Sequence, residues 1–229
     1  MRARVVVTTR AGGQSRPPYD ANNLALHVGD DPDAVRANRE RLARQLGVDR
    51  VTFMQQVHSN DVAVIRSREA TDDVAEVDAL VTNQPGVAIA VLVADCVPVV
   101  VTGTHTVAVA HAGRRGVADG VIASTVDAIR TIDDGPLVAV VGPSVCGRCY
   151  EVPAAMHDEF VREVPVAAST TSHGTTGLDL PAAVRDQLLT AGVEIRDDSH
   201  VCTMEDERFY SHRRDGVTGR FAMVAMLEP

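Results

Sequence analysis

The feature that most constrains the fold of this chain is a set of valine-rich runs that end at reactive side chains. Residues 87–100 read VAIAVLVADCVPVV, so Asp95 and Cys96 lie side by side between two apolar runs. Short apolar runs rich in β-branched residues are typical of buried strands. An acid and a thiol at the end of such a strand are either tolerated there or kept for chemistry. The sequence therefore predicts a buried strand that carries two reactive groups to its end.

The same reading along the chain predicts a mixture of strands and helices. Strands are expected over residues 5–9, 87–94, 106–110, 137–142 and 220–228, with two extended pieces in 51–65 that join near His58. Helices are expected over residues 31–47, 117–130, 152–163 (with Pro153 at its first position) and 181–192. The first helix has the clearest ends, because Asp31 can cap it, Pro32 suits its first position and Gly47 can close it.

The order of these elements bears on the fold class. Helices and strands do not alternate regularly enough for a doubly wound sheet or a barrel. We therefore expect one α/β domain over residues 1–229, with mixed strand directions.

Composition excludes several classes of function. The formal net charge is −9, which disfavours a nucleic-acid partner. All 22 basic residues are Arg, so Schiff-base and P-loop lysines are excluded, and Arg is the only fixed cation for a phosphate. No run approaches the roughly 20 apolar residues that span a bilayer, and the first apolar run is too short for a signal peptide. We expect a cytoplasmic protein whose four cysteines are thiols or metal ligands.

Three extended runs end at a side chain that can bind a metal. They are QQVH, ending at His58, VLVADC, ending at Cys96, and TVAVAH, ending at His111. Strand ends commonly line ligand crevices in α/β folds, and two His with one Cys leave a zinc ion one open position. A single buried His or Cys more often serves packing, but three at strand ends favour a catalytic zinc site.

Two further segments could bind an anion. In HAGRRG, Gly113 and Gly116 flank Arg114 and Arg115 just before a predicted helix, which suits phosphate. The Arg-rich segment FYSHRRDGVTGR (209–220) could contact a phosphate or carboxylate. The alternative for both is a solvated basic turn.

Two other motifs are weaker. Cys146 and Cys149 form a C-x-x-C pair that could bind zinc or do redox chemistry. Such a zinc site needs a second ligand pair, and the sequence shows none at a helpful spacing. His157 and Glu159 form H-x-E, half of a deaminase signature, but the order of the two halves is reversed and Val145 replaces the Pro. We reject that motif.

Seven segments in one order carry a resemblance to a known family. They are NLALHVGDD, QQVHSNDV, VDALVT, ADCVPVV, HAGRRG, GPSVCGRCYEV and FYSHRRDGVTGR. Together, from about residue 8 to 225, they resemble the family once called multicopper polyphenol oxidoreductases or laccase-like proteins. The family is now associated with purine nucleoside phosphorylase activity and, in some members, with peptidoglycan editing.

The resemblance implies a fold, a metal and substrates. The fold would be a single-domain, four-layer α/β/β/α sandwich with mixed sheets. His58, Cys96 and His111 would bind Zn²⁺, with Cu²⁺ possible. The substrates would be phosphate with adenosine, inosine or methylthioadenosine, and adenosine would also be deaminated. The chain departs from the family at Arg114, where Trp is usual, and at Ser59, where Gly is usual. We expect a monomer or homodimer with no membrane or nucleic-acid partner.

Further residues receive roles in this hypothesis. Asp95 would support the zinc ligand beside it or handle a proton. A catalytic zinc lowers the pKa of its water to about 7, which suits attack on adenosine. Arg115 and Arg213 would hold phosphate, and Asn23 and Tyr150 would also contact phosphate or substrate.

Three alternatives stay open. A copper oxidase needs many histidines, often in H-x-H pairs, and none of the eight His forms one, although a Cys-His₂ site would bind Cu²⁺ tightly. A cysteine hydrolase would use Cys96 as nucleophile and a His as base on a peptidoglycan precursor. The third alternative is a zinc module without catalysis.

Overall fold

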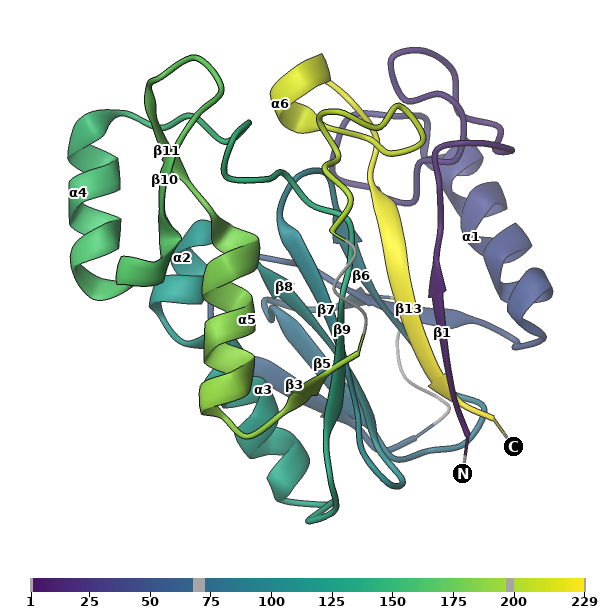
Figure 1. Cartoon of the computed structure of the whole chain (residues 1–229). Coiled ribbons are helices and arrows are strands. Elements are labelled where there is room, and N and C mark those ends of the chain that lie inside the picture. Colours follow the sequence, from purple (N-terminus) through teal and green to yellow (C-terminus); the bar gives the residue numbers. More distant parts are fainter. Residues whose placement is uncertain (1, 68–72, 197–199, 229) are drawn as a thin grey trace.

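The computed structural model describes residues 2–67, 73–196 and 200–228 (Figure 1). Its strands are β1 (Ala3–Val7), β2 (Val51–Met54), β3 (Val62–Ile65), β4 (Asp73–Val74), β5 (Ala79–Thr82), β6 (Ala88–Val93), β7 (Val97–Thr102), β8 (Val107–Ala112), β9 (Val138–Val141), β10 (Ala168–Thr170), β11 (Thr176–Leu178), β12 (Glu194–Ile195) and β13 (Phe221–Leu227). Its helices are α1 (Pro32–Leu46), α2 (Arg114–Ala118), α3 (Val121–Arg130), α4 (Ala154–Glu163), the 3₁₀ turn η1 (Pro165–Ala167), α5 (Leu180–Thr190) and α6 (His212–Asp215).

Two mixed sheets form the centre of the molecule. The first has the strand order β1-β13-β6-β2-β4, in which β13 is antiparallel to both β1 and β6, and β2 is parallel to β6 and β4. The second has the order β12-β9-β7-β8-β5-β3, with antiparallel pairing at its centre and parallel pairs β12–β9 and β3–β5 at its edges. The mixed strand directions expected from the sequence are confirmed.

The sheets and helices stack in four layers. Apolar side chains of β6 and β13, including Ile89, Val91 and Met223, pack against β7 and β8 between the sheets. The outer face of the first sheet packs against α1 through residues such as Leu42 and Phe53. The outer face of the second sheet is covered by α2, α3 and α5. Figure 1 shows α1 on one side and α3 and α5 on the other, so the α/β/β/α sandwich is confirmed.

Local sequence signals placed some helix ends well and others poorly. The first helix is capped by the Asp31 side chain and ends at Gly47, which has a φ of 76°. The single helix expected over 117–130 is wrong: α2 and α3 are separate, and Gly120 between them has a φ of 84° that only Gly adopts readily. Pro153 precedes α4 as its N-cap and does not occupy its first position.

The chain passes between the two sheets at the points where the candidate ligands lie. Residues 94–96 link β6 of the first sheet to β7 of the second, and Asp95 there has a φ of 93°. Residues 55–61 link β2 of the first sheet to β3 of the second, and His58 there has a φ of 63°. His111 in β8 pairs with Pro98 near the start of β7. The three ligands therefore meet at one end of the sandwich.

Within the described ranges, no helix is both long and apolar enough to cross a bilayer.

Candidate metal centre

The structure brings His58, Cys96 and His111 together. One potential ligand atom from each lies within 4.8 Å of the other two. Cys96 Sγ is 3.9 Å from His58 Nε2, and the two imidazole rings meet edge to face with centroids 4.7 Å apart. His111 is buried, while the His58 side of the cluster is exposed. The cluster therefore has one face in the core and one open to ligands.

Asp78 organises this cluster, and the sequence reading missed it. Its carboxylate is fully buried and lies 2.7 Å from His111 Nδ1, so the other ring nitrogen is left for a metal. The same carboxylate accepts hydrogen bonds from the backbone N–H groups of Val57, His58 and Ser59. Asp78 thus fixes both the orientation of His111 and the turn that carries His58. The available signal was a lone acid directly before the buried run ALVT.

Asp78, His111 and Cys96 also alter one another's pKa. Burial alone would raise the pKa of Asp78, but hydrogen bonds from His111 and Ser59 lower it to about 2. Burial alone would lower the pKa of His111, but the Cys96 thiolate and Asp78 raise it to about 9. Burial alone would raise the pKa of Cys96, but the imidazoles of His111 and His58 lower it to about 6. The lowered pKa favours the thiolate form of Cys96, which is the form that binds a metal.

Gly113 permits the close approach of these groups. A Cβ atom at this position would lie 2.5 Å from His58 Cδ2 and 3.5 Å from Cys96 Sγ. The Gly in HAG is thus explained by the space that the His58 ring occupies.

The donor set fits a divalent transition metal. One thiolate and two imidazoles are ligands that Zn²⁺ takes in tetrahedral catalytic sites, with a fourth position left open. The same donors also suit Cu²⁺. Among the described residues, no His besides His58 and His111 belongs to a potential metal-binding group. A cluster of several copper ions therefore has too few imidazole ligands here.

A pocket of about 290 Å³ opens beside the cluster. This volume is near the lower end of the range for small-molecule sites. The pocket is lined by two of the connections between the sheets, the start of α2, the segment before α4, the start of α5 and the short helix α6. The lining residues are His58, Ala94, Asp95, Cys96, Arg114, Arg115, Val145, Tyr150, Leu180, His212 and Arg213.

Basic and aromatic groups line the mouth of this pocket. Arg115 and Arg213, expected to bind phosphate, are both exposed there, and Arg114 and His212 join them. The guanidinium of Arg213 lies over the Tyr150 ring, 5.1 Å from its centroid, a distance typical of a cation–π contact. The pocket thus combines a metal-ligand cluster with cations suited to phosphate.

Both carboxylate oxygens of Asp95, which was expected to support the zinc ligand or handle a proton, accept hydrogen bonds from the protein. One carboxylate oxygen accepts a hydrogen bond of 2.6 Å from the Thr203 hydroxyl, and the other accepts one of 2.6 Å from the Arg213 backbone N–H. Its own backbone oxygen accepts from Val145 N–H. Asp95 therefore ties the crossing beside Cys96 to two loops that line the pocket.

Asn23 does not line the pocket, so its expected contact with substrate is corrected. It is fully buried, and its amide nitrogen donates to Ala25 O and Asp30 Oδ2. Its amide oxygen accepts from the backbone N–H groups of Ala25 and Arg220. All of its hydrogen-bonding capacity maintains the N-terminal loop, so none remains for a ligand.

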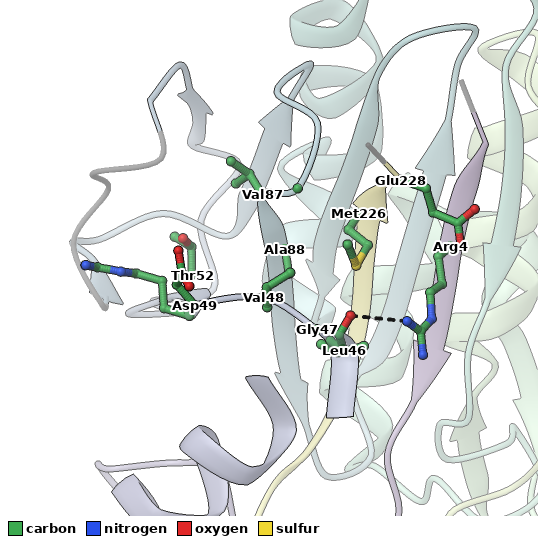
Figure 2. A pocket seen from close by; sticks show the side chains of 12 residues that line it. Arg4, Leu46, Gly47, Val48, Asp49, Thr52, Val87, Ala88, Met226 and Glu228 are labelled. Carbon is green, nitrogen blue, oxygen red and sulfur yellow. Dashed lines mark hydrogen bonds between the residues drawn. The ribbon is translucent and has the colours of Figure 1, made fainter. Parts of the chain in front are cut away.

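Another pocket, of about 360 Å³, lies at the end of α1 (Figure 2). Arg4 crosses it and donates a hydrogen bond of 3.3 Å to Leu46 O, drawn as a dashed line in Figure 2. The described residues that line it include no His or Cys. Its volume exceeds that of the pocket beside Cys96, but its described lining residues contain neither the imidazole nor the thiol that the other pocket offers.

Comparison with known proteins decides the family. The family model for multi-copper polyphenol oxidoreductase laccase matches residues 4–228. The chain belongs to this family. A solved structure of a Neisseria meningitidis protein superposes with a TM-score of 0.87 at 37% identity, and the match covers 99% of this chain and 95% of that one. YlmD from Geobacillus stearothermophilus gives a TM-score of 0.86 at 33% identity, covering 99% and 92%.

Curated relatives of this laccase-family chain carry a functional name. A Corynebacterium glutamicum protein named purine nucleoside phosphorylase is 46% identical over 98% of this chain and 94% of its own length. Proteins with the same name from Streptomyces coelicolor and Mycobacterium tuberculosis are 47% and 45% identical, over 96% and 100% of this chain and 94% and 93% of their own lengths.

Proposed function

We propose that this chain is a zinc-dependent purine nucleoside phosphorylase that acts on adenosine, inosine and methylthioadenosine, and that it also deaminates adenosine. One observation carries the proposal: the pocket beside the His58–Cys96–His111 cluster is lined by Arg115 and Arg213. A metal-ligand cluster and phosphate-binding cations in one small cavity suit a reaction between a neutral nucleoside and inorganic phosphate. The names of relatives at 45% to 47% identity support the same reaction.

The residues of the pocket divide the work of phosphorolysis. A phosphate oxygen forms a bond to the ribose C1′ as the bond from C1′ to the purine nitrogen breaks. The base leaves with that electron pair and takes up the proton that the phosphate gives up. Arg115 and Arg213 bind the phosphate and oppose its charge near C1′. The Tyr150 ring beneath Arg213 restricts the motion of that guanidinium, so Arg213 loses less conformational entropy when phosphate binds.

The metal ligands have their own part in this proposal. His58, Cys96 and His111 would hold the zinc ion, which when bound supplies a Lewis acid that polarises a substrate atom. Asp78 keeps the His111 ring in the tautomer that presents its free nitrogen to the cluster. The buried side of the cluster excludes water, and the exposed side faces the pocket.

Kinetics of point variants test this assignment. Cys96→Ala should abolish release of adenine from adenosine in the presence of phosphate, because the His58–Cys96–His111 cluster would lose its zinc ion. Arg213→Ala should raise the KM for phosphate about tenfold or more, since a charge-assisted contact is removed. Arg162→Ala, at an exposed position of α4, is the matched control and should leave both constants unchanged. Unchanged kinetics in Cys96→Ala would refute the assignment.

A second candidate is a cysteine hydrolase acting on a peptidoglycan precursor. The favouring observation is the chain of contacts from Cys96 to the imidazoles and from His111 to Asp78, which matches a Cys-His-Asp nucleophile arrangement. Metal binding separates the two candidates, because a thiolate bound to zinc is a poor nucleophile. Metal removal should abolish phosphorolysis, whereas a cysteine hydrolase should gain activity.

A further inference from the structure

A second group of metal-binding side chains lies apart from the pocket. We propose that Cys146, Cys149, Cys202 and Glu205 form a structural zinc site. Their three sulfurs and a carboxylate oxygen all lie within 4.8 Å of one another, and the group shares no residue with the His58–Cys96–His111 cluster. Cys149 Sγ is 3.6 Å from Glu205 Oε1. The sequence reading found no second pair for the C-x-x-C motif, and the fold supplies one more than fifty residues later.

The four residues occupy two turns of the same kind. In the first, the backbone N–H groups of Cys149 and Tyr150 both donate to Cys146 O at 2.9 Å. In the second, Glu205 N–H donates to Cys202 O at 3.2 Å, as does the next residue at 3.0 Å. Each turn brings two side chains, three positions apart, to one side. Paired ligands with two intervening residues are typical of structural zinc sites.

The two turns are held in register without help from the ligands. Ser144 N–H donates to Val201 O, and Thr203 N–H donates to Ser144 O, both at 3.1 Å, which forms a short parallel bridge. The Cys146 backbone N–H then points at Cys202 Sγ, 3.4 Å away. This N–H can donate to the Cys202 sulfur when that sulfur is a metal ligand. The protein backbone therefore positions the donors before any ion binds.

The number and type of the ligand atoms indicate which metal ion would bind and what that ion would do. Three thiolates and one carboxylate are soft and borderline ligands that suit Zn²⁺ far better than Mg²⁺ or Ca²⁺. Four protein ligands fill a tetrahedral shell, so no position is left for substrate and the site is structural. Arg148, 3.7 Å from Glu205 Oε1, offsets part of the negative charge that such a shell carries.

The position of this site links it to the pocket. The segment with Cys146 and Cys149 also contributes Val145 and Tyr150 to the pocket wall, and the segment with Cys202 leads to Arg213. Asp95 binds both segments beside the other cluster. A zinc ion here would fasten together the two loops whose Tyr150 and Arg213 side chains stack, so it would stiffen one wall of the pocket.

Metal analysis in a Cys96→Ala background tests the second site independently of the first and of the proposed activity. Purified from zinc-supplemented culture, Cys96→Ala should retain about one zinc per chain. The double variant Cys96→Ala/Cys149→Ser should retain almost none, and Cys96→Ala/Glu205→Gln should bind zinc more weakly. Cys96→Ala/Glu207→Gln, which alters an exposed carboxylate two residues away, is the control and should match Cys96→Ala.

Cobalt substitution identifies the ligands. Co²⁺ in Cys96→Ala should give thiolate-to-cobalt absorption, and Cys96→Ala/Cys149→Ser should lose most of that absorption, because the site no longer retains the ion. Circular dichroism would establish that each variant is folded. A folded Cys96→Ala protein without zinc, or zinc content unaffected by Cys149→Ser, would overturn the proposal. A non-reducing mass that shows a disulfide among these cysteines would overturn it as well.

Discussion

At the scale of single residues, Asp78 explains most about the candidate metal centre. Asp78 has no exposed surface, which is unusual for a carboxylate. The carboxylate binds His111 and three successive backbone N–H groups. Sequence patterns found the three ligands because each lies at the end of an expected extended run. They could not find Asp78, because its importance lies in contacts across 33 positions of sequence.

We predict that Asp78→Asn weakens metal binding by about 10- to 100-fold, because a neutral amide cannot hold the His111 ring or the turn at His58 as the carboxylate does. Competition with a chromophoric chelator would measure the change. Asp61→Asn, an exposed acid on the same connection, is the control and should bind like wild type. Equal affinity in Asp78→Asn would show that the carboxylate does not support the metal ligands.

At the scale of elements, short connections fix the structure as much as strands and helices do. Asp133, between α3 and β9, is a buried carboxylate that accepts hydrogen bonds from the His105 and Gly135 backbone N–H groups and from the Thr106 hydroxyl. Burial alone would raise the pKa of Asp133, but these hydrogen bonds lower it. One side chain thus joins the α3–β9 connection to the β7–β8 turn.

We predict that Asp133→Asn lowers the free energy of unfolding at neutral pH by about 1–3 kcal/mol. Because the folded-state pKa is lowered, this stabilisation is present above the ordinary Asp range and is lost as the pH falls through the folded-state pKa. The difference from wild type should therefore shrink below about pH 4. Urea unfolding at neutral pH and below about pH 4 would measure this difference. Asp134→Asn, at an exposed position, is the control. A deficit that does not change with pH would contradict this account.

The elements also show how far local sequence signals reach. The caps of α1 at Asp31 and Gly47 were readable, because they act over a few neighbouring residues. The break between α2 and α3 could not be predicted from the sequence. The spacing of apolar residues continues past Gly120, although the backbone turns at Gly120. The sequence did not predict the two-residue strands β4 and β12, because they are too short for a pattern and are defined by their pairing with β2 and β9.

At the scale of the whole molecule, two sheets with helices outside explain why the candidate site forms where it does. Two of the connections that run from one sheet to the other, at residues 55–61 and 94–96, each carry a metal ligand. The order of the expected strands and helices predicted a mixed α/β protein, and the resemblance to the family implied the sandwich. Strand order and the meeting of distant loops, such as the four-residue group at Cys146, depend on packing that the sequence does not display.

The most direct test of the central claim is the stoichiometry of products from inosine. Zinc-loaded protein would be incubated with inosine, with and without phosphate, and followed by phosphorus NMR together with chromatography of the base. We predict equal amounts of hypoxanthine and ribose 1-phosphate, and no base release without phosphate. Base release that ignores phosphate and leaves free ribose, or no release from protein with its zinc bound, would contradict a phosphorylase.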